Sequence, residues 1–195
     1  MQSQRKSDLS AIDLGIEIND ESGLQETGNL PNVERARRIL SLYFFQILSG
    51  GDVCLLDLRA SSFSLSGETL YWNPKPWITR WEPEFLDGLQ HLYRGFYEND
   101  DAAFQLGLKQ LGMKDVEDAF RERFAHAGAM RFTTKSLTEN FHTVFVACRE
   151  KKVTLNRGFL SLGLYLATLY DHLEGLDVEV DVSDAYERVS KVLRD

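Results

Sequence analysis

The sequence predicts a mainly α-helical domain that carries one small β element, a strand and a hairpin, near residues 53–72. Apolar residues recur at the spacing of a helix over residues 33–47, and they do so again from Pro83 to about residue 193. Between these two regions the apolar residues alternate or run together, which is typical of short strands. The pair Gly50-Gly51 and the proline-rich residues 73–76 separate this β element from the helices on either side.

We expect the first helix to begin at Asn32, whose side chain can cap it, and to end before Gly50-Gly51. The apolar run over residues 53–58 predicts a buried strand, and the apolar residues on both sides of Ser66-Gly67 predict a hairpin. The predicted apolar face of the first helix comprises Val33, Ala36, Ile39, Leu40, Tyr43, Phe44 and Ile47.

From Pro83 onward the spacing predicts helices and no strands, because Pro83 suits a first helical turn and apolar faces follow it to the end of the chain. Residues 99–101 are expected to cap the second of these helices. A capping box over residues 136–139 would begin a helix over residues 135–151, and Ser183 would cap the last helix. The helix over residues 156–173 is the most apolar, so we expect it to be the central one.

The composition fits one globular domain over residues 32–195, preceded by a polar tail. The chain has 195 residues, of which 43% are hydrophobic, and this is enough to bury a sizeable core. Residues 1–31 are polar with only scattered apolar positions, so we expect a mobile tail with room for one short ordered segment. The sequence gives no basis for predicting an oligomeric state.

Charge and cysteine content narrow the classes of partner and compartment. The net charge is −8 and no run of Lys or Arg forms a basic stripe, so we expect no nucleic-acid partner. No apolar stretch approaches the ~18 residues of a membrane span, so we expect no transmembrane segment. Cys54 and Cys148 lie in apolar runs and are interpreted as buried thiols of a cytoplasmic protein.

Three positions after the first helix follow the pattern of a phosphotransfer loop. Such a loop needs an Asp that orients the nucleophile, an Asn five residues later that holds metal, and a second Asp on metal. Asp57 stands in the first position, Ser62 replaces the Asn, and Asn73 follows the second hairpin strand where the second Asp belongs. We interpret Asp57 as a relic of this chemistry.

These residues give the chain a resemblance to the UbiB/AarF-type atypical kinase family, in which F-x-Q-x-x-x-x-G precedes H-x-D-x-H-P-G-N, a hairpin and D-F-G. The segment Phe44-Phe45-Gln46 with Gly50-Gly51 is similar to the helix end, and Asp57 and Gly67 fall on the Asp and the hairpin glycine. Leu55 and Arg59 replace the two histidines, and residues 73–75 replace D-F-G. The resemblance extends over about residues 33–190, and nothing in the chain is similar to the family's small lobe.

The resemblance implies a kinase-C-lobe-like helical domain that has lost catalysis, needs no cofactor and binds a protein partner. One alternative is a residual or split phosphotransferase that uses Mg-ATP, with Asp57, Ser62 and Asn73 around the metal and the small lobe on a separate chain. Loss of both metal ligands and of the ATP-binding Lys disfavours this alternative, because kinase catalysis rests on positioning and on charge stabilisation.

A second alternative is a metal–carboxylate protein built on helices. Glu139 and His142 form an E-x-x-H pair, and Asp87 and His91 lie four residues apart. Helical di-iron sites need about six such ligands, and only one E-x-x-H exists. The simpler interpretation is that these histidines, and His172 beside Asp171, lie on helix surfaces next to acids.

Trp72, Trp77 and Trp81 lie in a connector that also contains three prolines. Tryptophan is enriched at the centres of protein interfaces, which makes the three residues candidates for partner binding. The other interpretation, which we favour, is that the connector packs over the helices and closes the core.

Overall fold

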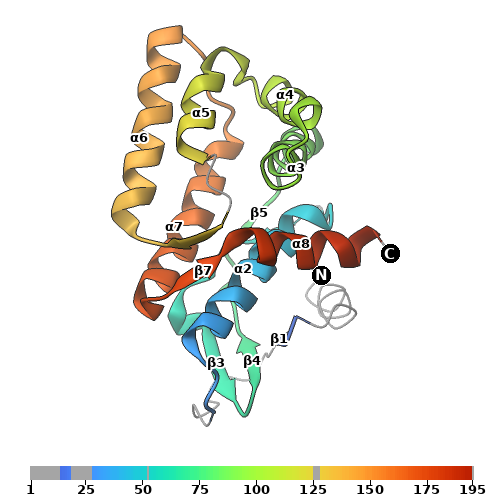
Figure 1. The fold of residues 1–195 in the computed structure, drawn as a ribbon, viewed down its shortest axis with the longest axis vertical. Helices are drawn as coiled ribbons and strands as arrows, with labels where there is room; N and C mark the ends of the chain where they lie inside the picture. The colour runs from blue at the N-terminus through green and yellow to red at the C-terminus, as the bar shows by residue number, and fades with distance from the viewer. Residues whose placement is uncertain (1–13, 19–27, 52, 125–127, 195) are drawn as a thin grey trace.

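The computed structural model describes residues 14–18, 28–51, 53–124 and 128–194. Helix accounts for 62% of the structure and strand for 13%, which confirms the mainly α-helical class. In Figure 1, α3, α4, α5 and α6 lie towards one end of the molecule and the β3–β4 hairpin lies at the other. Helix α8 crosses between them, in front of α2.

The described residues contain seven α-helices and two short 3₁₀ helices. They are α2 (Asn32–Leu48), α3 (Pro83–Tyr97), α4 (Asp101–Gln110), α5 (Glu117–Phe124), α6 (Thr134–Lys151), α7 (Gly158–Leu176), α8 (Val182–Arg194), η1 (Ala60–Ser62) and η2 (Lys114–Val116).

Short strands form three small sheets. The largest has the order β1-β4-β3, in which β4 pairs antiparallel with β3 and parallel with β1. The strands are β1 (Ile16–Ile18), β2 (Cys54–Leu55), β3 (Phe63–Ser66), β4 (Thr69–Trp72), β5 (Ile78–Thr79), β6 (Ala129–Arg131) and β7 (Glu179–Asp181). The predicted hairpin is therefore present, with Gly67 at φ +61° in its turn, a conformation that glycine adopts without strain.

Helix α2 is the central helix, which corrects the prediction that the most apolar helix would be central. Every residue from Ile39 to Ile47 is buried, so α2 is covered on all sides. Helix α7 instead has an outward side, on which Leu160 and Leu164 are 75% and 47% exposed. The apolar face predicted for the first helix holds from Ala36 onward, but Val33 is exposed because it lies in the first turn, before the helix enters the core.

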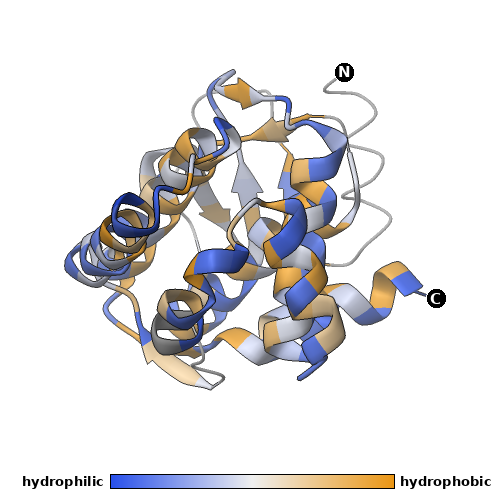
Figure 2. Cartoon of the chain, turned by 90° about the horizontal axis from the view of Figure 1, so that it is seen from above, coloured by the Kyte–Doolittle hydropathy of each residue, from blue (hydrophilic) through white to orange (hydrophobic). Residues whose placement is uncertain are grey.

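Hydropathy follows burial within the helices. Figure 2 shows hydrophobic and hydrophilic residues together on the same helices, as amphipathic packing requires. In α7, Leu162 and Leu169 are buried, whereas Leu166 is only half-buried because it borders a cavity.

Two of the predicted helix starts are confirmed. Pro83 is the first residue of α3. Asp100 caps α4, since its carboxylate accepts a hydrogen bond from the amide of Ala103 at 3.0 Å. Both starts carry strong local signals, a proline at N1 and an aspartate at the N-cap.

Three other predicted caps are wrong. Pro31 precedes α2, and the Asn32 side chain instead donates to the carbonyl of Leu176 at 3.0 Å. Thr133 caps α6 by accepting from the amide of Ser136. Asp181, rather than Ser183, accepts from the first amides of α8. At each of these helix starts, several adjacent side chains could cap the helix, and tertiary packing selects among them.

The prediction that strands are confined to residues 53–72 is also wrong, because β1, β5, β6 and β7 lie outside that range. Each has only two or three residues, too few to show an alternating pattern. Within residues 53–58, only Cys54 and Leu55 are paired as a strand, although the whole run is buried as predicted.

The N-terminal segment contributes an ordered strand to the domain. Ile16 and Ile18 are buried in β1, and Leu30 is buried before α2. The Arg38 guanidinium on α2 donates to the carbonyl of Gly15 at 3.0 Å. The rest of the predicted mobile tail, residues 1–13 and 19–27, lies outside the described residues.

The two cysteines are buried free thiols, as predicted. No helix in the described part of the chain is both long enough and apolar enough to cross a membrane.

Candidate functional site

The candidate site lies on the buried, extended segment that follows α2. Gln46, near the end of that helix, holds the segment with its side-chain amide. Its Oε1 accepts from the amide of Leu55 at 2.9 Å, and its Nε2 donates to the carbonyl of the same residue at 3.1 Å. The Gln46 side chain thus satisfies both backbone groups of Leu55 and holds β2 to the end of α2.

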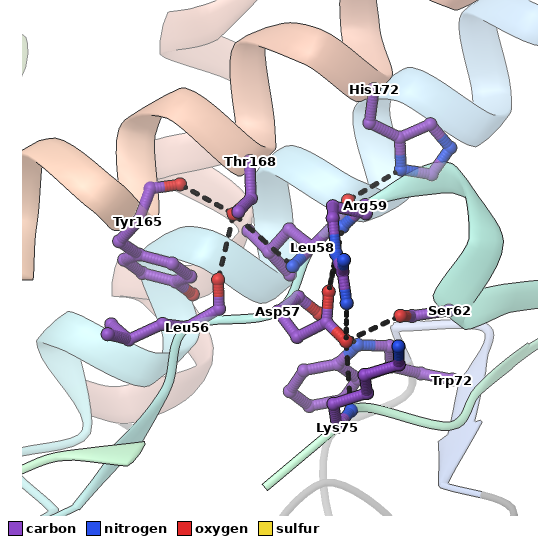
Figure 3. Close-up of polar contacts among 10 residues, drawn as sticks. All are labelled: Leu56, Asp57, Leu58, Arg59, Ser62, Trp72, Lys75, Tyr165, Thr168 and His172. Carbon is purple, nitrogen blue, oxygen red and sulfur yellow. Dashed lines mark hydrogen bonds and ion pairs between the residues drawn. The ribbon is translucent and has the colours of Figure 1, made fainter. Parts of the chain in front are cut away.

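Helix α7 supports the next residues in the same way (Figure 3). The Thr168 hydroxyl donates to the carbonyl of Leu56 at 2.8 Å and lies 3.3 Å from the amide of Leu58. His172 Nδ1 lies 2.8 Å from the carbonyl of Leu58, so Nδ1 carries the proton. Buried backbone groups need such partners, and here side chains supply them where no sheet does.

His172 is therefore a structural residue of the interior, which corrects its interpretation as a surface histidine. Its ring also packs against Phe63, with centroids 5.1 Å apart. Burial lowers the pKa of His172, and the bond to Leu58 offsets only part of that effect.

The Asp57 carboxylate is fully buried and accepts hydrogen bonds from three residues (Figure 3). Arg59 forms an ion pair with it, with Nε 2.7 Å from Oδ1 and Nη2 3.1 Å from Oδ2. Oδ2 also accepts from the Ser62 hydroxyl at 2.6 Å and from the amide of Lys75 at 2.9 Å. The segment that carries Asp57 is itself held in place by Trp72, whose indole donates to the Asp57 carbonyl at 2.8 Å.

These contacts keep Asp57 ionised. Burial alone would raise the pKa of the carboxyl, but the bonds from Arg59, Ser62 and the Lys75 amide, with the charge of Arg59, together lower it to about 2. The bond to Asp57 in turn raises the pKa of Arg59. A cation could reach Asp57 only if the carboxylate gave up some of these bonds.

The structure brings two of the three loop candidates into direct contact. Ser62 lies in η1 and bonds to Asp57 through its side chain. Asn73 is joined to them only by its backbone amide, which donates to the Ser62 carbonyl at 2.8 Å, and its side chain is exposed. If a cation were held here, Asp57 and Ser62 would be the residues to bind it, with Asn73 at the edge.

No sequence pattern indicated that Arg59, Lys75, Thr168 or His172 would bond to this segment. Arg59 lies two residues from Asp57 in an extended segment, where side chains two residues apart point to the same side. This spacing could have predicted the contact between them. The other contacts join residues far apart in the sequence, so no local pattern predicts them. Lys75 is 18 residues from Asp57, and Thr168 and His172 are 110 and 114 residues from Leu58.

The tryptophans divide between packing and exposure. Trp72 and Trp81 are buried, and the indole of Trp81 donates to the Ser161 hydroxyl on α7 at 2.7 Å. They hold the connector against the core and cannot meet a partner directly. Trp77 is 39% exposed, with the Arg59 guanidinium 3.9 Å from its ring centre.

The two candidate metal pairs line separate hollows. Asp87 and His91 border one with Arg94, and the Asp87 carboxylate accepts from the Gln110 amide. Glu139 borders a second hollow and His142 a third. No group of three or more His, Cys, Asp or Glu side chains gathers anywhere in the described part of the chain.

No model of a known protein family matches the chain, and no curated protein matches it. Fold and site together define a mainly α-helical domain with a buried, fully bonded aspartate on an extended segment between α2 and a β-hairpin.

Proposed function

We propose that the chain is a kinase-C-lobe-like domain that has lost phosphotransfer and acts by binding a protein partner. The order of elements supports this proposal. Helix α2 leads into an extended segment with Asp57, then a hairpin with Gly67 at its turn, as in the resembling family. Two further segments, residues 94–112 and 153–176, are similar to the family's later helices, and they contain the last turn of α3 and all of α4 and α7.

The observation that carries the proposal is the bonding of Asp57. In a working loop this carboxylate must be free to orient the nucleophile. Here Arg59, Ser62 and the Lys75 amide occupy it, and the carboxylate itself is fully buried. The carboxylate stabilises the loop, and this use competes with the catalytic one.

A surface for the partner is available on α6 and α7. A groove of about 430 Å³ lies between them, and on its border Phe145 and Leu160 are 43% and 75% exposed. Large exposed apolar residues that gather around a groove are typical of interaction sites. Leu164, one turn after Leu160, extends the exposed side of α7.

The partner that fits this surface is an amphipathic helix with basic flanks. A groove between two helices accepts the apolar face of a third helix. The chain has a net charge of −8, which favours a basic partner and speeds its association. With its two buried thiols, the protein would meet this partner in the cytoplasm.

A thermal-shift titration with Mg-ATP tests the loss of nucleotide chemistry. A ligand at 100 times its dissociation constant stabilises a protein by about 2.7 kcal/mol. We expect no shift for the wild-type chain. A magnesium-dependent shift that Ser62→Ala or Asp57→Asn removes would support the residual phosphotransferase instead.

Partner binding is tested in a pull-down with three baits, which are the wild type, Leu160→Asp and Val192→Asp. Val192 is a matched control, because it is 46% exposed on α8. We expect one protein to bind the wild type and Val192→Asp in equal amounts and to be lost from Leu160→Asp. That protein, once purified, should bind the wild type directly. Equal binding to all three baits would contradict the proposed surface.

A further inference from the structure

A second cavity, of about 330 Å³, is built from residues that take no part in the Asp57 network. It lies between α2, α3, α6 and α7, beside β6. Its buried floor includes Leu40 and Phe44 of α2 and Leu169 of α7. Its volume falls at the lower end of the range of small-molecule sites, which are concave and mostly apolar.

Tyrosine hydroxyls are the polar groups that converge on this cavity. Tyr43 and Tyr93 bond to each other through their hydroxyls. Tyr97 and Tyr170 also line the cavity, and their hydroxyls have no hydrogen-bond partner among the described residues. Both hydroxyls can therefore donate to a ligand that enters the cavity, and a few convergent polar groups on mostly apolar walls are typical of small-molecule sites.

The hydroxyls share one space and carry no charge. The rings of Tyr93 and Tyr97 lie with their centroids 6.2 Å apart, and Tyr170 lines the same cavity. Burial raises the pKa of Tyr97, and the neighbouring Tyr93, Tyr170 and Tyr186 raise it further. Burial likewise raises the pKa of Tyr93 and of Tyr170 to about 12. All of these phenols are therefore protonated donors at neutral pH.

The charged side chains at the rim are already occupied. Arg131 forms an ion pair with Asp177, and Glu139 lies 3.8 Å from the Lys135 ammonium. The cavity lining carries one side chain of each sign, so an ion that entered would lose its hydration with little net charge to compensate, which is costly. An uncharged ligand avoids this cost.

We propose that this tyrosine-lined cavity binds a small, uncharged aromatic compound that carries a hydrogen-bond acceptor, such as an aryl ketone. The rings of the ligand pack against the aromatic walls, and its carbonyl oxygen accepts from Tyr97 or Tyr170. The cavity adjoins the proposed partner groove, because Leu137 of α6 lines both, but the proposal does not rest on that groove.

The test uses 6-propionyl-2-dimethylaminonaphthalene, a neutral aryl ketone whose emission shifts to the blue when it leaves water. We expect saturable one-to-one binding to the wild-type chain. Tyr97→Phe and Tyr170→Phe keep the rings and remove one hydroxyl each. The variant that loses the hydroxyl bonded to the ketone should bind the probe about five-fold more weakly, which corresponds to one hydrogen bond. Leu166→Phe places a larger side chain at the half-buried border and should weaken binding ten-fold or more.

Tyr71→Phe is the matched control, because Tyr71 lies in β4 and does not line the cavity, and its affinity should equal that of the wild type. Circular dichroism confirms that each variant is folded. Three outcomes would overturn the proposal. The first is no binding up to the solubility limit of the probe. The second is unchanged affinity in all of the cavity variants. The third is that the anionic 1-anilinonaphthalene-8-sulfonate binds with the same affinity as the ketone and is weakened equally by the same substitutions, which would refute the uncharged ligand class.

Discussion

The Asp57 side chain joins two parts of the chain that are 18 residues apart, since it bonds Arg59 and Ser62 on one side and the amide of Lys75 on the other. A buried carboxylate is costly unless such bonds compensate for its lost hydration. From the sequence, Asp57 and Ser62 were expected near each other only in the Mg-ATP alternative, because their spacing follows the kinase pattern. The sequence could not predict Lys75, because that contact depends on how the connector folds back.

Asp57→Asn is predicted to lower the free energy of unfolding by about 2 kcal/mol at pH 7. The folded pKa of Asp57 is about 2, below the value of about 3.9 in unfolded chains. A lowered folded pKa stabilises the protein above the unfolded pKa, and this stabilisation is lost as the pH falls through the folded value. The gap between wild type and variant should therefore close between about pH 4 and pH 2.

Urea unfolding at pH 7, 4 and 3 measures this gap. Glu187→Gln, on the exposed side of α8, is the control and should change the unfolding free energy by less than about 0.5 kcal/mol. A constant gap at all three values of pH would show that Asp57 contributes through its shape and not through its charge.

Gln46 is the second residue whose role is structural. Gln46→Leu keeps the size of the side chain but leaves the amide and the carbonyl of Leu55 without their partner. Each unsatisfied buried group costs about 1–3 kcal/mol, so the loss of stability for the two groups should be about 2–6 kcal/mol.

Gln90→Leu provides the comparison for Gln46. The Gln90 side chain makes one bond, to the carbonyl of Ile47 at 2.8 Å, and it is only partly buried. Its replacement should cost about 1 kcal/mol. If the two variants lost equal stability in chemical denaturation, the Gln46 bonds to the extended segment would contribute no more to stability than the single Gln90 bond.

At the scale of the elements, helices were predictable and short strands were not. A helix of ten or more residues repeats its apolar face several times, as α3 does from Phe85 to Leu92. A strand of two residues, such as β5, shows no period at all and forms only because β2 lies beside it. The caps of α6 and α8 were misplaced for a related reason, since neighbouring threonine, serine and aspartate side chains compete for the same amides.

The close approach of α3 and α4 depends on glycine. A Cβ atom on Gly107 would lie 2.6 Å from the backbone nitrogen of Leu92 and 2.8 Å from the carbonyl oxygen of Gly88. Backbone atoms cannot move aside singly, so the two helices would have to separate. Gly107→Ala should therefore destabilise the protein by about 2–3 kcal/mol.

Gly163→Ala on α7 is the opposite case and serves as the control for Gly107→Ala. The nearest atom to its added Cβ would be a ring carbon of Phe141 at 3.5 Å, an ordinary contact. Alanine is the better helix former, so this variant should gain about 0.5–1 kcal/mol. Thermal unfolding compares the two, and a stabilising Gly107→Ala would mean that α3 and α4 pack less closely than described.

At the scale of the whole molecule, contacts between distant parts of the sequence set the architecture. The chain returns to its beginning, because β1 pairs with β4 and α8 packs across α2 (Figure 1). Composition predicted a single domain from residue 32, but it could not show that residues 16–18 complete a sheet. Three residues with two isoleucines carry too little signal within a polar segment.

Ile18→Ala tests whether β1 belongs to the same cooperative unit as the helices. Ile18 is buried and pairs in register with Trp72, which is itself fully buried. Loss of its side chain should cost about 2–4 kcal/mol, the usual range for a buried isoleucine. Glu17→Ala, exposed on the same strand, should cost less than about 0.5 kcal/mol.

Tryptophan fluorescence and circular dichroism should report one shared unfolding midpoint, and this midpoint should fall in Ile18→Ala, because the sheet covers the core that α2 and α7 build. If fluorescence changed in an earlier, separate step while the helices stayed folded, β1 and the hairpin would form an independent unit and the single-domain boundary would need to be redrawn.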